Sequence, residues 1–385
     1  MTGRKHADIA IIAGLSAAFW LLVLLLVGHL RFANDLRGFL FLGSDFSHPP
    51  ALAGIPPYGE QGYDGQFYAA LATDPFISRH ETVRSLDTPS YRGSHLLAPL
   101  LAYLTAFGQP AAAIRTYQGL VWLGALAAVV LAAALLKREG RSPWWALLLV
   151  PNAGLAASIM RSTPDGLALA LALASLWFYA QGRRRLALLT ITLATLTREI
   201  YLVGALAYAW QELREGRRQG AASFAGWPLG LLVAISTWLH ITVAPLTPLG
   251  GSLGIPFRWV MQKFDQMLAA NIKFTSIELW GFVALVAVLL SLSGYNRREE
   301  RLAIEDWTYL AFMALSWTLS FAVYVDVYGY TRALMILPFL AVVLAARQED
   351  LGKRLVLLSV PAMFAFVGLL MVRAEIKAAL LLFRG

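Results

Sequence analysis

The chain of 385 residues contains no cysteine and few charged residues. Without cysteine, neither a disulfide framework nor a thiolate metal site can form, and redox chemistry says nothing about the compartment. Charged residues make up 14% of the chain, hydrophobic residues make up 58%, and the mean hydropathy is +0.61. Soluble domains carry about 25% charged residues. The composition therefore excludes an ordinary soluble domain and predicts a protein that spans a membrane several times.

Apolar segments recur along the whole chain. The first segment, residues 8–30, is longer than the apolar part of a cleaved signal peptide and is followed by no small-residue cleavage site, so we interpret it as a retained helix. Hydropathy predicts an all-α bundle of about 11 transmembrane helices that forms a single transmembrane domain. Within the domain, residues 1–385, the expected spans are 8–30, 111–136, 143–160, 165–181, 186–197, 199–210, 225–243, 277–293, 307–325, 332–346 and 355–372.

The net charge of +9 comes largely from basic residues between these segments. A basic excess is also typical of nucleic-acid-binding proteins, but in a membrane protein it marks cytoplasmic loops, so we expect no nucleic acid partner. If the N-terminus is cytoplasmic and the C-terminus is outside, every inner connection is basic. These connections contain Arg4 and Lys5; Lys137, Arg138 and Arg141; Arg183, Arg184 and Arg185; Arg214, Arg217 and Arg218; Arg297, Arg298 and Arg301; and Arg347, Lys353 and Arg354.

Two long outer loops follow from this topology, residues 31–110 and 244–276. No inner loop is as long, and the sequence shows no internal repeat, so the working surface is expected to face outward. Residues 94–107 are apolar but too short for a span and predict a helix at the membrane interface. Outer cations such as Arg92, Arg161 and Lys263 are expected to contact lipid headgroups. The compact loops favour a bacterial cytoplasmic (inner) membrane.

Residues 186–210 must cross the membrane twice, because they lie between two arginine-rich connections. Their middle is Thr197-Arg198-Glu199, which predicts two short helices that break at the arginine. Irregular backbone at membrane depth is tolerated where it is buried in protein or lines a cavity. Arg198 and Glu199 then have two interpretations: a structural ion pair that holds the break, or an arginine directed at a phosphate.

Two carboxylates stand out at the outer ends of the predicted spans. Asp64 lies between aromatic residues, in a segment that predicts an amphipathic helix resting on the membrane; the simpler interpretation is an Asp-Gly turn. Asp165 follows Pro164 and begins the fourth span, where helix N-terminal stabilisation is also sufficient. The histidines of the first loop, His48, His80 and His95, lack the spacing of metal ligands.

Arg332 begins the tenth span after two tyrosines. Tyr328 and Tyr330 are typical of an aromatic belt at the interface, but an arginine on the outer side is disfavoured unless an anion contacts it. Charged residues beside spans are costly and often functional. We therefore include Arg332 among the candidate site residues.

Several short motifs together resemble the GT-C superfamily of integral-membrane glycosyltransferases, including the protein O-mannosyltransferases and the aminoarabinose transferases. Asp64 followed by Tyr68 looks like the first-loop acidic motif, and Leu196-Thr197-Arg198 resembles a basic motif at a short hairpin. The remaining similarities are His95 to Leu100, Arg161 to Asp165, and Tyr330 to Pro338. The chain departs from the family in having arginine where lysine is commoner, no second acid beside Asp64, and no soluble domain after its last helices.

The resemblance implies sugar transfer from a polyprenyl-phosphate donor at the outer face of the membrane. By this resemblance Asp64 is the catalytic base, and Asp165 positions the acceptor or joins Asp64 around a divalent cation such as Mg²⁺ or Mn²⁺. The donor phosphate is expected at Arg198, Arg332 and Arg161. Substrate contacts are expected from Tyr63, Gln66, Tyr68, His95 and Glu199.

Two other classes of function are compatible with the same residues. A transporter or flippase of a lipid-linked or anionic substrate could use Asp165, Arg198 and Glu199 along its path. Transporters often contain paired repeats, and no repeat is visible here. A non-catalytic protein that binds lipid-linked sugar is the third possibility.

Overall fold

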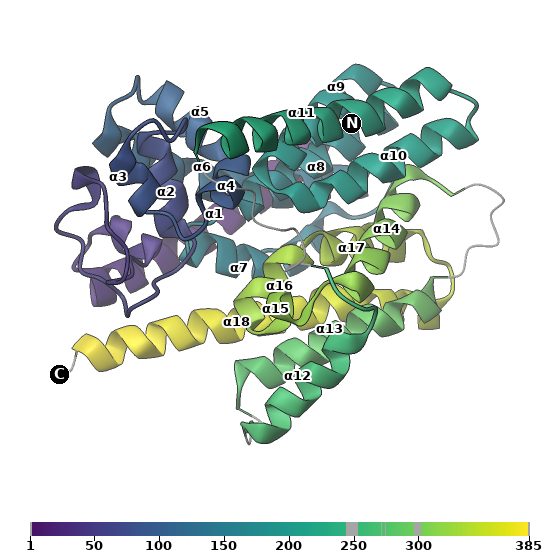
Figure 1. Cartoon of the computed structure of the whole chain (residues 1–385). Helices are drawn as coiled ribbons and strands as arrows, with labels where there is room; N and C mark the ends of the chain where they lie inside the picture. Colours follow the sequence, from purple (N-terminus) through teal and green to yellow (C-terminus); the bar gives the residue numbers. More distant parts are fainter. Residues whose placement is uncertain (1, 244–252, 271, 274, 296–301, 384–385) are drawn as a thin grey trace.

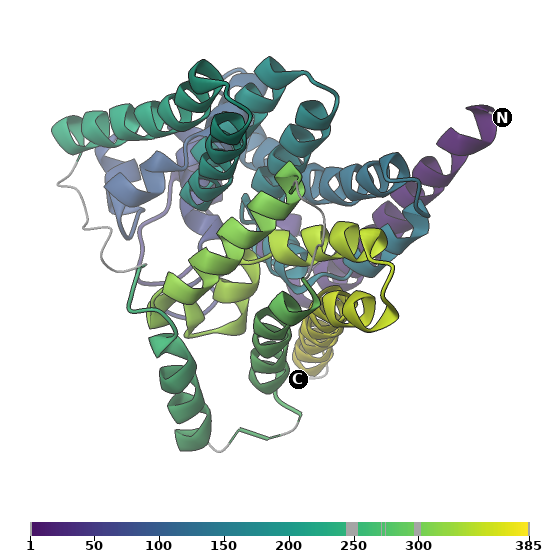
Figure 2. The same ribbon diagram turned by 90° about the vertical axis from the view of Figure 1, so that its right-hand side faces the viewer.

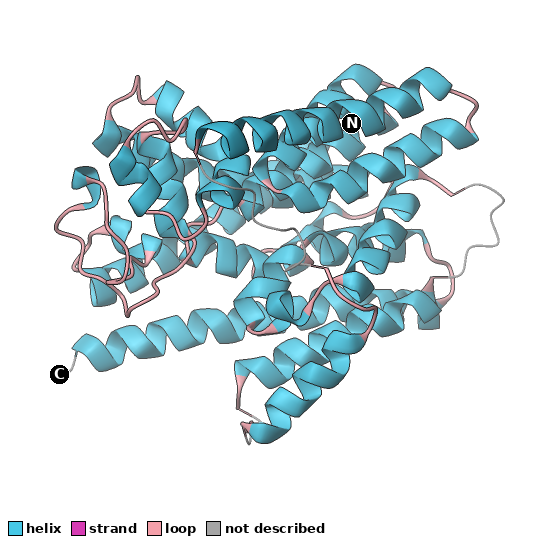
Figure 3. Ribbon diagram, in the orientation of Figure 1, coloured by secondary structure: helices cyan, strands magenta, loops and turns pink. Residues whose placement is uncertain are grey.

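The computed structural model describes residues 2–243, 253–270, 272–273, 275–295 and 302–383. Within these ranges the regular structure is helical, and the only β-type pairing is an isolated bridge between Leu253 and Leu319. Figure 3 shows helices throughout the described chain. The prediction of an all-α protein is therefore confirmed.

Among the residues that the structure describes, five helices are long and apolar enough to cross a membrane. They are α1 (Thr2–Phe32), α6 (Pro110–Arg138), α11 (Arg218–Thr242), α13 (Ile277–Gly294) and α18 (Leu351–Phe383). Two bent helix pairs raise the number to as many as 7 if each pair is one span. These pairs are η3 (Pro143–Leu149) with α7 (Ala153–Met160), bent by 59°, and α16 (Val327–Ala333) with α17 (Ile336–Arg347), bent by 50°.

The predicted count of about 11 spans is not confirmed. The other expected spans are helices, but they are short: α8 (Asp165–Ala180), α9 (Arg184–Thr197), α10 (Leu202–Arg214) and α14 (Ile304–Thr318). A helix rises 1.5 Å per residue, so the 14 residues of α9 cover about 21 Å, less than the roughly 30 Å of a hydrocarbon core.

The centre of the bundle is α17, in which Ile336 to Ala346 are all buried. It packs against α18, α14 and α6. Its residues are almost all aliphatic, so every face of the helix can be covered by protein. The expected break after α9 is also present: α9 ends at Thr197, and a short turn, η4 (Glu199–Tyr201), leads into α10.

The first loop folds into a series of short helices. These are η1 (Leu36–Leu40), η2 (Pro50–Leu52), α2 (Gly65–Thr73), α3 (His80–Arg84), α4 (Pro89–Ser94) and α5 (Leu97–Thr105). The segment after Asp64 is a helix as predicted, but all residues of α2 are buried, and α2 packs against α5 and α6. The prediction that it rests on the membrane is therefore wrong, because protein encloses it.

The second predicted loop, 244–276, contains a helix that the sequence did not indicate, α12 (Arg258–Ala269). Residues 244–252 lie outside the described part of the chain, as do Arg297, Arg298 and Arg301. Lys263 in α12 is fully buried, and its Nζ lies 2.7 Å from Glu278 Oε2. It therefore forms an internal ion pair and does not contact lipid headgroups. A short helix, α15 (Phe321–Tyr324), packs against α12.

The two ends of the bundle differ in character. The helices of the first loop gather at the left in Figure 1, where the C-terminus also lies, and the α10–α11 turn lies at the right. Figure 2 looks onto the right-hand end. At the end carrying the turn, arginines pair with acids of neighbouring helices, such as Arg184 with Glu212 and Arg347 with Glu139.

Candidate functional site

Asp64 and Asp165 meet at the guanidinium of Arg332. Asp64 lies just before α2, Asp165 is the first residue of α8, and Arg332 belongs to α16. Arg332 Nη2 donates a hydrogen bond of 3.0 Å to Asp64 Oδ2, and Arg332 Nη1 lies 3.4 Å from Asp165 Oδ2. One cation thus contacts both candidate carboxylates.

Glycine at position 65 allows this meeting. A Cβ atom on Gly65 would lie 2.2 Å from the carbonyl oxygen of Arg161, so only glycine lets the first loop touch the turn before α8. Ser162, in that turn, has a φ of 47°, in the left-handed region. The Tyr117 hydroxyl donates a 2.7 Å hydrogen bond to the Ser162 carbonyl and anchors the turn to α6.

Each carboxylate also has an arginine of its own. Arg92 Nη2 donates a hydrogen bond of 2.9 Å to Asp64 Oδ1, and Arg92 also holds Asp87. Arg198 Nε lies 3.0 Å from Asp165 Oδ1. The three arginines, Arg92, Arg198 and Arg332, are each 8% exposed. Buried cations are costly unless they are paired, so the two aspartates stabilise all three guanidinium groups.

The pKa of Asp64 reflects these neighbours. Burial alone would raise it, but the charges of Arg92 and Arg332 lower it by more, so the pKa lies well below its ordinary value. Asp64 is therefore ionised, and in this arrangement it is a weak base.

A chain of hydrogen bonds extends from Arg198 to the neighbouring Glu199. Arg198 Nη1 donates to the Tyr68 hydroxyl at 2.9 Å, and that hydroxyl lies 3.1 Å from His95 Nδ1. His95 Nε2 bonds Glu199, whose other oxygen accepts a 3.2 Å bond from the Tyr91 hydroxyl. Arg198 and Glu199 thus contact different partners. The interpretation of the two residues as a structural ion pair that holds the break does not fit this arrangement.

Arg161 lies beside this cluster but faces another acid. It pairs with Glu375 of α18, which also pairs with Arg31 of α1. The Arg161 guanidinium lies 3.9 Å from the centre of the Phe41 ring. The sequence grouped Arg161 with the phosphate-binding arginines, but its charge is directed to Glu375.

The residues expected to contact substrate divide into two groups. The Arg332 guanidinium lies 5.0 Å from the ring centre of Tyr63, so this tyrosine borders the cluster. Gln66 is 1% exposed and holds the loop by accepting from the Gly43 backbone at 2.8 Å. Tyr68 and His95 are both fully buried. Gln66, Tyr68 and His95 therefore support the site and cannot touch a substrate in this arrangement.

Sequence reasoning missed several members of these networks, among them Arg92, Tyr91 and Glu375. Arg92 was grouped with headgroup contacts, because its position in an outer loop says nothing about a partner 28 residues earlier. A lone acid shortly after the last expected span, 355–372, was the available signal for Glu375. Tyr91 carried no distinguishing pattern.

A divalent cation between Asp64 and Asp165 does not fit this arrangement. In each aspartate, Oδ2 contacts Arg332, and Oδ1 contacts a further arginine. Mg²⁺ or Mn²⁺ would need several oxygen ligands and would lie beside three positive charges. In the described part of the chain, no group of three or more His, Asp or Glu side chains could hold a metal ion.

No family model, curated protein or solved structure matches the chain. The interpretation of the site therefore rests on the residues of this chain and on their geometry.

Proposed function

We propose that this protein is a GT-C-type membrane glycosyltransferase that moves a sugar from a polyprenyl-phosphate donor to a hydroxyl of a lipid, glycan or protein acceptor. The observation that carries the proposal is the guanidinium of Arg332 between two carboxylates, each of which keeps a further arginine. Guanidinium groups bind phosphate oxygens through paired hydrogen bonds. A carboxylate can accept the proton of an attacking hydroxyl.

The reaction is a single displacement that inverts the anomeric carbon. The acceptor oxygen bonds to the anomeric carbon as its proton passes to Asp64. The bond between that carbon and the phosphate oxygen breaks, and its electron pair leaves with polyprenyl phosphate. Arg332 and Arg198 offset the charge that grows on the leaving phosphate. Asp165 is 1% exposed, so it acts through the two arginines that it orients, Arg198 and Arg332.

Donor binding also activates the base. When a phosphate takes hydrogen bonds from Arg332, Asp64 loses one of the two cations that most depress its pKa. The pKa of Asp64 then rises toward its ordinary value, and the carboxylate becomes a better proton acceptor. The base is thus strengthened only when a donor is present, which limits side reactions in the empty protein.

An outward-facing site in a bacterial inner membrane is part of the proposal. Arg198 follows the last residue of α9, and the basic residues Arg184 and Arg185 are at its first turn, about 20 Å away along the helix. Basic turns mark the cytoplasmic side. We therefore propose that the aspartate cluster, at the opposite end of α9, faces the outer side.

The direct test uses purified full-length protein and a panel of radiolabelled polyprenyl-phosphate sugars, with membrane lipid and glycan fractions as acceptors. We expect label in one acceptor fraction and stoichiometric release of polyprenyl phosphate. Asp64→Asn should lower turnover by a factor of about 100 or more, since general base catalysis contributes about 10²–10⁴. Its thermal unfolding should stay cooperative.

The matched control is Asp45→Asn, which alters an exposed acid of the same loop outside the cluster. It should transfer sugar at the wild-type rate. Near-normal turnover in Asp64→Asn would remove the assignment of the base. Movement of intact lipid-linked sugar across vesicles without release of polyprenyl phosphate would favour the transporter alternative.

A further inference from the structure

A second charged pocket lies at the other end of α9 and α10. It has a volume of about 550 Å³ and lies between the start of α9, the end of α10 and the start of α11. Four arginines line it: Arg184, Arg185, Arg217 and Arg218. This pocket has no part in the proposed transfer reaction.

Two acids form ion pairs with two of these four arginines. Glu212 is fully buried and pairs with Arg184 and Arg217, and Arg217 also pairs with Glu215. Among the described residues, Arg185 and Arg218 have no ion-pair partner, so four positive charges face two negative ones. The pocket therefore carries an unneutralised positive charge of about two.

The helix ends at the pocket add to this charge. α9 begins at Arg184 and α11 at Arg218, and neither helix has a side-chain hydrogen bond at its N-cap. A helix N-terminus carries partial positive charge and is stabilised by acids, so arginines are unfavourable there. An anion bound at this pocket would stabilise two such helix ends and two unpaired arginines together.

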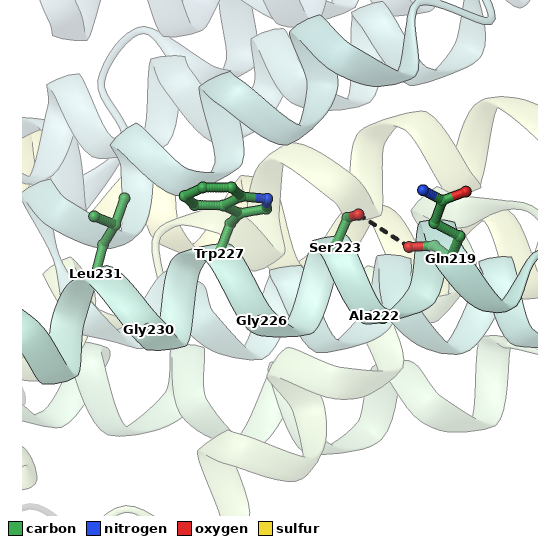
Figure 4. Close-up of a pocket in the computed structure, with 7 residues that line it drawn as sticks. All are labelled: Gln219, Ala222, Ser223, Gly226, Trp227, Gly230 and Leu231. Atoms are coloured by element: carbon green, nitrogen blue, oxygen red, sulfur yellow. Dashed lines mark hydrogen bonds between the residues drawn. The ribbon is translucent and has the colours of Figure 1, made fainter.

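A shallow apolar groove, lined by residues of α11 alone, continues from this pocket along the helix. The groove has a volume of about 570 Å³ and shares Gln219 and Ser223 with the charged pocket. Figure 4 shows Trp227 and Leu231 projecting on the same side of α11 as Ser223. A Cβ atom on Gly226 or Gly230 would meet nothing within 4 Å, so the space above the glycines is open.

The length of the groove matches one leaflet of a bilayer. From Gln219 to Leu231 the helix rises about 18 Å, and half of a hydrocarbon core is about 15 Å. The groove thus runs from the arginines toward the middle of the membrane. α11 is also only 17% buried along its apolar window, so the groove opens outward from the bundle.

We propose that the pocket and the groove together bind one phospholipid with an anionic headgroup, such as phosphatidylglycerol. The phosphate lies at Arg185 and Arg218, and one acyl chain lies along Gly226 and Gly230. The glycines of α11 would also allow a second copy of α11 to pack closely against it. In a parallel two-fold pairing, however, the arginines of the two copies would face each other, and this repulsion disfavours a protein occupant.

Native mass spectrometry of the full-length protein in mild detergent tests the charged pocket. Phosphatidylglycerol and phosphatidylcholine with identical acyl chains are titrated separately. The double variant Arg185→Gln/Arg218→Gln leaves the two partners of Glu212 in place, so the fold keeps its buried ion pairs. We expect phosphatidylglycerol to bind on the order of 30-fold more weakly. Phosphatidylcholine should lose less, because its choline cation already offsets the phosphate charge that the arginines attract.

The matched control is Arg141→Gln/Arg183→Gln, which removes the same charge from exposed positions that do not line the pocket. It should retain phosphatidylglycerol as the wild type does. An equal loss in this control would overturn the proposal, because net charge and not the pocket would then decide binding.

Gly226→Leu/Gly230→Leu tests the groove by filling it. Leucine replaces glycine in a helix interior without a backbone clash and with a better helix propensity, so the fold should be kept. We expect phosphatidylglycerol retention to fall about 10-fold, the effect of losing burial of roughly two CH₂ groups of the acyl chain. Phosphatidylglycerol retention at the wild-type level in this variant would overturn the lipid assignment. So would a wild-type dimer that becomes a monomer in the variant while lipid binding stays unchanged, because a second copy of the chain would then occupy the groove. Soluble glycerophosphate that competes as well as the intact lipid would likewise exclude a role for the groove.

Discussion

Arg332→Gln is the substitution that separates the proposed phosphate role from a structural one. Glutamine removes the charge and the fork that joins Asp64 to Asp165. Each aspartate keeps another arginine, so neither carboxylate becomes unpaired. Breaking a buried ion pair costs about 3–5 kcal/mol, and we expect a loss of unfolding free energy near the lower end of that range.

The effect on the donor is separate from the effect on stability. A hydrogen bond to a charged group contributes about 1.5–3 kcal/mol, so polyprenyl phosphate should bind about 10- to 150-fold more weakly to Arg332→Gln. Arg332→Lys keeps the charge, but its single ammonium cannot offer the paired geometry of guanidinium. Its donor affinity should lie between those of the wild type and Arg332→Gln.

Two measurements on detergent-purified protein check this: thermal unfolding, and titration with polyprenyl phosphate. The double variant Arg332→Gln/Asp64→Asn removes the carboxylate charge together with the cation. It should recover part of the lost stability while donor affinity stays low. Donor affinity that recovers together with stability would refute the reasoning, because Arg332 would then act only by holding the fold.

Three further predictions concern the surrounding networks. Glu375→Gln leaves two buried arginines without their acid and should lower the unfolding free energy by about 3–5 kcal/mol. The control is Glu349→Gln, which alters an exposed acid. Equal thermal unfolding of the two variants would contradict the pairing. Tyr68→Phe removes the hydroxyl that links Arg198 to its histidine neighbour and should cost about 1–3 kcal/mol in thermal unfolding, with unchanged stability contradicting the link. The pKa of Asp64 lies below its ordinary value of about 3.9, so the stability from its ion pairs is complete above that pH and is lost as the pH falls below it. The unfolding free energy should therefore decline less between about pH 7 and about pH 3 in Asp64→Asn than in the wild type. Identical profiles of unfolding free energy against pH would contradict the depressed pKa.

The helical class and the break at Arg198 could be predicted because each follows from a local pattern. Continuous apolar runs predict helices, and an Arg-Glu pair in the middle of one run predicts an interruption. The number of spans could not be predicted in the same way. α8 is apolar but only 16 residues long, and hydropathy does not distinguish a short buried helix from one that crosses the bilayer.

The partners of the charged residues were beyond sequence reasoning. Topology placed Asp64, Asp165, Arg198 and Arg332 at one end of the bundle, and the structure brings them into contact. Nothing in their spacing distinguishes Arg92, which contacts Asp64, from Arg161, which turns to another acid. That choice depends on the three-dimensional packing: the backbone beside Asp64 lies against the Arg161 carbonyl, yet the Arg161 side chain is directed to Glu375.

The separation of Asp64 and Arg332 along the chain, 268 residues, has a consequence for biosynthesis. Ribosomes add about 5–20 residues per second, so Asp64 is made roughly 13–54 s before Arg332. Throughout that interval the nascent first loop lacks the cation that joins it to the later helices. Insertion factors therefore meet a half-assembled electrostatic cluster, and a truncated chain that stops before α16 should expose this loop to protease.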